Sequence, residues 1–160
     1  MLREQTIENF LKRIQPQDLV ISSNGKLSRE LYELRLKRGE PTNDFYMLGS
    51  MGCAVSIGLG VALNTKKQVF VLTGDGALLM KLGSLATIAK YKPENLHIIV
   101  LNNDCHNTTG GQPTNFKEVR SFVESICEVI DVEKGTRDNL GRVNMTPEQI
   151  KDAFMAKVRS

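Results

Sequence analysis

Residues 68–103, QVFVLTGDGALLMKLGSLATIAKYKPENLHIIVLNN, contain the pattern that decides the fold of this chain. The stretch begins and nearly ends with continuous apolar runs, at residues 68–73 and 96–101. Apolar runs without alternation are typical of parallel strands that helices cover on both faces. Between the two runs, apolar residues recur at helical spacing over residues 77–90. The stretch therefore predicts a strand, a helix and a second, parallel strand.

The alternation of helix and strand continues on both sides of this unit. Gly39 is a stop signal for one of the flanking helices, and Thr146, Pro147 and Gln149 are typical of a helix start. We expect further strands at residues 18–22 and 127–132, and further helices at residues 7–14, 28–38, after the turn at 49–52, at 115–125 and from 147 onward. The predicted fold is α/β, a three-layer sandwich in which helices cover both faces of a mainly parallel central sheet.

Composition limits the classes of protein to which the chain can belong. With 160 residues, 41% of them hydrophobic and 24% charged, we interpret residues 1–160 as a single globular domain. The net charge of +3, spread along the chain, argues against a nucleic-acid partner. The charged N-terminus and the absence of any long apolar run argue against a leader peptide and a membrane. Three cysteines without CxxC spacing indicate reduced thiols, so we expect a cytoplasmic protein.

Polar residues follow both strands of the 68–103 unit. Asp75 lies between two glycines after the first strand, and Asn102 and Asn103 follow the second. Ligands of parallel sheets bind beyond the carboxyl ends of the strands, and carboxylate and amide oxygens suit Mg²⁺. Backbone amides at the start of the next helix favour an anion, so we expect a magnesium ion that holds a diphosphate. The alternative is purely structural, with Asp75 as a helix N-cap and the asparagines as turn residues.

Several stretches resemble one family of enzymes. Residues 74–103, from GDG to NN, are similar to the motif by which thiamine diphosphate-dependent enzymes bind magnesium and thiamine diphosphate. LGSMG, residues 48–52, resembles the segment that holds the aminopyrimidine of the cofactor in those enzymes. ISSNGKLSRELYEL, NNDCHNTTGGQPT and KGTRDNLGR are similar to the cofactor-binding part of phosphonopyruvate and sulfopyruvate decarboxylases. The resemblance implies a thiamine diphosphate-binding fold with thiamine diphosphate and Mg²⁺ as cofactors.

The resemblance also implies a role for particular residues. Asp75, Asn103 and the backbone carbonyl of Cys105 are the implied magnesium ligands. The implied cofactor-binding residues are Gly49, Ser50, Met51, Asp75, Gly76, Ala77, Asn103 and Cys105. Among these, the amides of Gly76 and Ala77 would meet the diphosphate. The carbonyl of Gly49 would accept from the 4′-amino group, and Met51 would keep the cofactor bent. The alternative for Met51 is a residue of the hydrophobic core.

Other polar residues are candidates for catalytic, substrate-binding or structural roles. His106 directly follows the predicted metal loop and is our candidate catalytic residue, as a donor to the substrate or a proton carrier. The alternative is a solvated loop histidine. His97 opens an apolar strand, and we interpret it as structural. Arg137 and Arg142 lie in a basic loop suited to a dianionic substrate, although exposed arginines are common.

The resemblance implies decarboxylation of a small acidic 2-oxo acid. The first reading is phosphonopyruvate decarboxylase, which yields phosphonoacetaldehyde and carbon dioxide. The alternatives are the beta subunit of sulfopyruvate decarboxylase and a thiamine diphosphate-binding module without catalysis. In this family the glutamate that activates the cofactor belongs to a second, pyrimidine-binding domain. We therefore expect a second chain to supply that domain, in a hetero-oligomer.

The chain departs from the family pattern between residues 115 and 127. Members of the family carry a helix, a strand and another helix there, whereas NFKEVRSFVESI is long enough for one helix only. Either the sheet is one strand short, or residues are absent from the chain near 117–122. A missing edge strand would leave apolar surface for a partner to cover.

Overall fold

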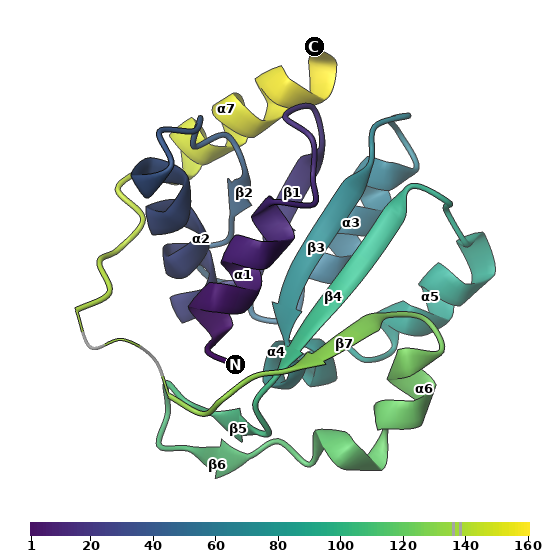
Figure 1. The fold of residues 1–160 in the computed structure, drawn as a ribbon. Coiled ribbons are helices and arrows are strands. Elements are labelled where there is room, and N and C mark those ends of the chain that lie inside the picture. Colours follow the sequence, from purple (N-terminus) through teal and green to yellow (C-terminus); the bar gives the residue numbers. More distant parts are fainter. Residues whose placement is uncertain (136, 138) are drawn as a thin grey trace.

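The central sheet contains five parallel strands in the order β2-β1-β3-β4-β7, among residues 1–135, 137 and 139–160, which the computed structural model describes (Figure 1). The strands are β1 (Leu19–Ser22), β2 (Phe45–Tyr46), β3 (Val69–Gly74), β4 (Leu96–Asn102) and β7 (Glu128–Asp131). β3 and β4 are direct neighbours, with Val69 opposite Leu96 and Gly74 opposite Leu101. The parallel pair predicted from residues 68–103 is therefore confirmed.

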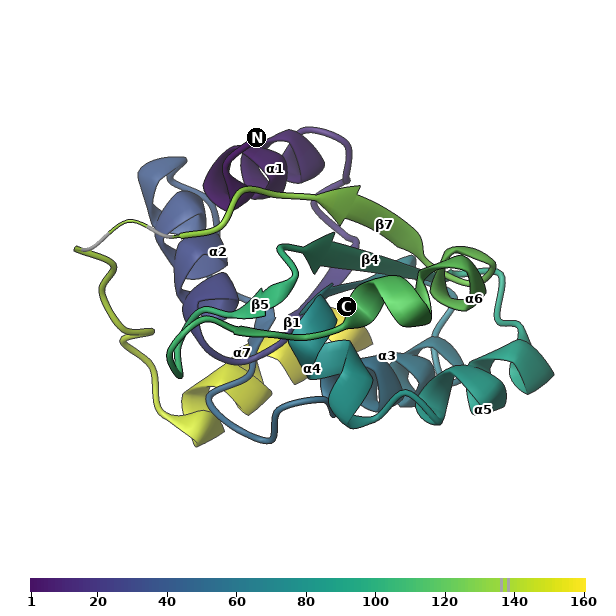
Figure 2. The same ribbon diagram turned by 90° about the horizontal axis from the view of Figure 1, so that it is seen from below.

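Helices cover both faces of the sheet, as Figures 1 and 2 show. The helices are α1 (Arg3–Leu11), α2 (Lys26–Lys37), α3 (Ala54–Ala62), α4 (Asp75–Met80), α5 (Ser84–Tyr91), α6 (Arg120–Glu124) and α7 (Pro147–Arg159), with a 3-10 turn at Phe116–Glu118. One hydrophobic core joins the sheet to α1 and α2, and the other joins it to α3, α5 and α6. The three-layer α/β sandwich is confirmed. None of the described helices has the length and apolar character needed to cross a membrane.

Small residues bring α3 close to the sheet. A Cβ atom added to Gly58 would lie 2.3 Å from Cγ2 of Val71 on β3, so only glycine permits this distance between helix and strand. The predicted end of one helix and the predicted start of another are also observed. Gly39 has a φ of 65° just after α2, and the side chain of Thr146 accepts a hydrogen bond from the Gln149 amide at the start of α7.

Other elements differ from the expectation. The helix predicted over residues 77–90 is two helices, because the chain leaves helical geometry at Lys81, with φ −135° and ψ 39°. Gly83, a poor helix former, follows, and the turn at Gly52 packs against Lys81. The helix predicted at 115–125 is likewise divided, into a 3-10 turn and α6. The first helix ends at Leu11 rather than continuing to Ile14.

The strand order creates a crevice. From β1 the chain crosses through α2 to β2 on one side, whereas β3, β4 and β7 follow one another on the other side. The chain therefore turns in opposite directions after β1 and after β3. Ligands of open α/β sheets bind at such a switch point, beyond the carboxyl ends of the two strands.

Candidate functional site

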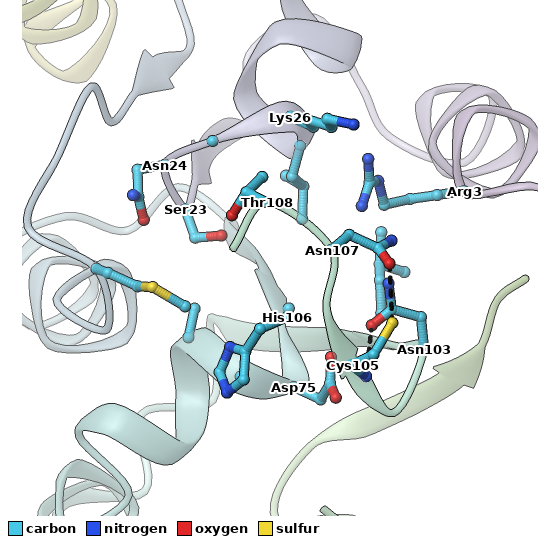
Figure 3. A pocket seen from close by; sticks show the side chains of 17 residues that line it. Arg3, Ser23, Asn24, Lys26, Asp75, Asn103, Cys105, His106, Asn107 and Thr108 are labelled. Atoms are coloured by element: carbon cyan, nitrogen blue, oxygen red, sulfur yellow. Dashed lines mark hydrogen bonds between the residues drawn. The ribbon is translucent and has the colours of Figure 1, made fainter. Parts of the chain in front are cut away.

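A cavity opens at this switch point, and segments that follow three neighbouring strands form its walls (Figure 3). Its lining consists of Ser23, Asn24, Gly25, Lys26 and Leu27 after β1, Gly74, Asp75, Gly76 and Ala77 after β3, Leu101, Asn103, Cys105, His106, Asn107 and Thr108 from the end of β4 onward, and Arg3 and Met51. Seven of the nine predicted site residues thus line one cavity: Met51, Asp75, Gly76, Ala77, Asn103, Cys105 and His106. Gly49 and Ser50 do not line it.

Asp75 is the first residue of α4, and its side chain does not cap that helix. Gly74 occupies the N-cap position, without a side-chain capping bond. Asp75 is 2% exposed, and its Oδ2 accepts a hydrogen bond of 2.6 Å from Oγ1 of Thr114. The N-cap alternative for Asp75 is therefore wrong. Because a carboxylate has about four acceptor positions, the bond to Thr114 leaves room for a metal ion.

Asn103 and Cys105 belong to the turn that follows β4. Oδ1 of Asn103 accepts a hydrogen bond of 3.2 Å from the Cys105 amide, and Asp104 between them has a φ of 55°. The turn leads into a small antiparallel hairpin of β5 (Cys105–His106) and β6 (Gln112–Pro113), which the sequence analysis did not anticipate. The neighbouring Asn102 instead donates from Nδ2 to Oδ1 of Asp131 on β7, at 2.8 Å.

The donor set suits magnesium. The described residues hold no group of three or more His, Cys, Asp and Glu side chains of the kind that binds zinc. Asp75 and Asn103 line the cavity and carry a carboxylate and a side-chain amide oxygen, and such oxygen donors suit Mg²⁺.

His106 packs directly on Gly76. A Cβ atom on Gly76 would lie 2.6 Å from Cε1 and 2.7 Å from Nδ1 of the imidazole. The ring of His106 thus occupies the space that any side chain at position 76 would need. The ring is half-buried at the cavity wall.

The segment of residues 49–52 forms a tight turn beside the cavity. Ser50 and Gly52 have φ values of 55° and 94°. Met51 is half-buried and lines the cavity, so the core alternative for Met51 is wrong. Gly49 and Ser50 are exposed and line a separate depression outside it.

The wall that follows β1 belongs to the family-like stretch ISSNGKLSRELYEL, but none of its residues was among the predicted site residues. Ser23, Asn24 and Gly25 reach the cavity because β1 lies next to β3, and local patterns do not reveal strand order. Arg3 of α1 also reaches it, held by hydrogen bonds of 2.5 and 2.9 Å from its guanidinium to the buried carboxylate of Glu30. The detectable signal was the polar SSNG directly after a buried strand.

The remaining predicted polar residues lie elsewhere. Nε2 of His97 is 2.7 Å from Oε1 of Gln68, and its ring stacks on Phe70, which agrees with a structural role. Arg137 forms an ion pair with Glu33. Burial opposes ionisation of Glu33, but hydrogen bonds from the Gly141 amide and Arg137 outweigh it and lower the pKa of Glu33. Positions 136 and 138 of the same basic loop lie outside the described residues.

Comparison with known proteins identifies relatives of this chain that are named as decarboxylases. Phosphonopyruvate decarboxylase of Streptomyces hygroscopicus is 47% identical over 112 residues, which cover 70% of this chain and 27% of that protein. The enzyme of the same name from Streptomyces viridochromogenes is 35% identical over 187 residues, 98% of this chain and 46% of that protein. The chain therefore spans less than half the length of these two relatives.

A third relative matches this chain over most of the length of both proteins. The sulfopyruvate decarboxylase subunit beta of Methanothermobacter thermautotrophicus is 53% identical over 167 residues, 89% of this chain and 88% of that protein. Residues 24–156 match the family described as thiamine pyrophosphate enzyme, C-terminal TPP binding domain, where pyrophosphate is another name for diphosphate. The match covers the cavity walls after β1, β3 and β4, and the chain belongs to this family of thiamine diphosphate-binding domains.

Proposed function

We propose that the chain is the thiamine diphosphate- and magnesium-binding subunit of a 2-oxo acid decarboxylase that converts phosphonopyruvate to phosphonoacetaldehyde and carbon dioxide. The observation that carries the proposal is the position of Asp75, Asn103 and Cys105 in one cavity at the switch point of the sheet. The two Streptomyces relatives bear the name of this activity.

The described residues have definite roles in this proposal. Asp75, Asn103 and the Cys105 carbonyl hold Mg²⁺, and the amides of Gly76 and Ala77 donate to the diphosphate. Met51 supports the cofactor from the cavity wall, and the carbonyl of Gly49 accepts from the 4′-amino group. Bound thiamine diphosphate supplies the carbon nucleophile and the electron sink that decarboxylation requires.

His106 is the proposed catalytic residue. Its ring, packed on Gly76, donates a hydrogen bond to the substrate or carries a proton at the cavity wall. An imidazole suits this role because one ring nitrogen can donate a proton while the other accepts one.

The site needs a second chain in this proposal. Ser50 and Gly49 are exposed, so the predicted aminopyrimidine segment is open to contact from outside the chain. The chain spans 27% and 46% of the phosphonopyruvate decarboxylases but 88% of a relative named as a subunit. We infer a hetero-oligomer in which the partner supplies the pyrimidine-binding domain and the activating glutamate.

The three unpaired cysteines support a cytoplasmic location.

A second candidate substrate is sulfopyruvate. The observation that favours it is the relative named sulfopyruvate decarboxylase subunit beta, which matches this chain over most of both lengths. Both substrates are 2-oxo acids with a strongly acidic end group, so the same site chemistry serves either.

We also propose that residues 1–160 are one domain, shortened between residues 115 and 127. Two alignments run over 187 and 167 positions, more than the 160 residues of this chain, so those relatives contain residues without a counterpart here. The short α6 between the 3-10 turn and β7 supports this position for the difference.

Native mass spectrometry of the protein from its own cells, followed by cofactor titration, tests the function. We expect a complex with a second chain, thiamine diphosphate and Mg²⁺, and turnover of phosphonopyruvate or sulfopyruvate. Asp75→Asn should abolish Mg²⁺-dependent cofactor binding, whereas Asp152→Asn, an exposed aspartate on α7, should leave it unchanged. Equal cofactor affinity in the Asp75 variant would contradict the site, and cofactor binding without turnover would favour a non-catalytic module.

A further inference from the structure

A second cavity, of about 410 Å³, lies beside the cofactor cavity and shares part of its wall. Asn24, Gly25 and Thr108 line both cavities. The remaining lining residues are Ser28, Arg29, Met47, Leu48, Arg142 and Val143. Met47 and Leu48 lead directly into the turn at residues 49–52, so this cavity adjoins the cofactor site on the side of the predicted aminopyrimidine segment.

Two arginines from distant parts of the sequence meet at this cavity. Arg29 is half-buried in the first turns of α2, and Arg142 is exposed in the loop that precedes α7. Among the residues that the structure describes, the lining contains no acidic side chain. Within residues 1–135, 137 and 139–160, neither arginine makes an ion pair, whereas Arg3, Arg35 and Arg137 each bind a carboxylate. Two such guanidinium groups favour a ligand with more than one negative charge.

The shared wall offers further hydrogen-bonding groups. Oδ1 of Asn24 is buried and has no hydrogen-bond partner in the described part of the chain. The oxygen and the NH₂ group of an asparagine amide have nearly the same shape. Rotating this amide by about 180° therefore presents the NH₂ group at the position of Oδ1. α2 begins at Lys26 without a side-chain cap, so its positive end lies beside the same wall.

We propose that Arg29 and Arg142 form a subsite for the strongly acidic end group, a phosphonate or sulfonate, of the 2-oxo acid substrate. This proposal rests on the proposed function, and it names the residues that select substrates by their acidic end group. The acidic end binds the two guanidinium groups, and the keto acid end extends across the shared wall toward the cofactor cavity. Pyruvate has no such end group and gains nothing from the subsite.

Steady-state kinetics of the assembled holoenzyme test the subsite. Arg29→Met and Arg142→Met remove the charge and keep a long side chain, and Arg159→Met at the end of α7 is the matched control. Each variant should raise KM for phosphonopyruvate or sulfopyruvate about 10- to 100-fold, the effect of losing one charge-assisted hydrogen bond. The kcat, the KM for pyruvate and the thiamine diphosphate affinity should stay within twofold of the wild type. Arg29→Lys should fall between wild type and Arg29→Met.

Two results would overturn the subsite. If the variants lose thiamine diphosphate affinity and keep their KM, the arginines bind the diphosphate of the cofactor instead. If KM rises equally for pyruvate, they do not recognise the end group.

Failure of the proposed function would look different, because the wild type would then decarboxylate neither acid. In that case calorimetry with methylphosphonate tests the subsite directly. Binding that both methionine substitutions weaken would support it, and absent or unaltered binding would overturn it.

Discussion

At the residue scale, the contact between Gly76 and His106 gives a direct prediction. Gly76→Ala places a methyl group within 2.7 Å of the imidazole, which must move away from the cavity wall. We expect a loss of about 1–3 kcal/mol in the free energy of unfolding, as for other overpacked sites. We also expect at least tenfold weaker thiamine diphosphate binding in the assembled protein. Thermal denaturation and a cofactor titration measure the two effects.

Gly83 provides the control for this substitution. A Cβ atom there meets nothing within 4 Å, and Gly83 has ordinary negative φ at the start of α5. Gly83→Ala should therefore change both quantities little. Equal effects of the two substitutions would show that the imidazole contact is not their cause.

The sequence singled out Asp75 and Asn103, whereas it assigned no individual role to the residues of the opposite cavity wall, although they lie in the family-like stretch ISSNGKLSRELYEL. Asp75 stands out because a carboxylate between two glycines follows a strand directly. Asn102 and Asn103 look alike in sequence, and only the geometry of the turn sends Asn102 toward Asp131. Arg3 was undetectable because the contact of α1 with the cavity depends on packing between helices far apart along the chain.

At the element scale, continuous apolar runs and capping residues were reliable, whereas helical spacing did not reveal helix breaks and very short strands left no pattern. The continuous runs of β3 and β4 predicted two parallel strands, which the structure places side by side, and the capping residues predicted the start of α7. β2, with two residues, is too short to produce a pattern, and tertiary pairing alone creates it. The break between α4 and α5 depends on the turn at Gly52, which contacts Lys81 from another part of the chain.

The link between β4 and β7 gives a prediction about pH. Hydrogen bonds from Arg120, and then from Asn102, lower the pKa of Asp131. The unfolded chain thus binds this proton more readily, so the stabilisation is present above the usual aspartate pKa and declines as pH falls through the lowered value. In Asp131→Asn, the free energy of unfolding should depend less on pH between about 5 and 3.

Urea denaturation at several pH values measures this dependence, with Asp152→Asn as the exposed control. The same variant should also weaken Mg²⁺-dependent cofactor binding modestly, because Asn102 precedes the proposed ligand Asn103 and loses its charged partner. The role of Asp131 would be contradicted if Asp131→Asn left both the pH dependence of the free energy of unfolding and the cofactor affinity unchanged.

At the scale of the whole molecule, the sheet ends in a short strand. β7 has four residues, and its ends carry the exposed acidic residues Glu128 and Asp131. Charged residues at a sheet edge oppose pairing with other chains. If relatives place an additional strand in the segment that is short here, this edge is the position that the strand would occupy or cover.

The opposite edge depends on a buried ionic network, and it supplies the last prediction. Asp44, fully buried before β2, accepts hydrogen bonds of 2.7 and 3.1 Å from Arg35 of α2. Lys157 of α7 lies 3.8 Å from the same carboxylate, and burial lowers the pKa of Lys157 while the charge of Asp44 opposes that change. Asp44 therefore joins α2, β2 and α7.

Asp44→Ala would leave two cations buried without this carboxylate, so we expect a loss of about 3–5 kcal/mol in the free energy of unfolding. Asp152→Ala removes the exposed pair with Lys151 and should cost less than about 1 kcal/mol. Urea denaturation measures both. A loss below about 1 kcal/mol for Asp44→Ala would mean that water replaces the carboxylate.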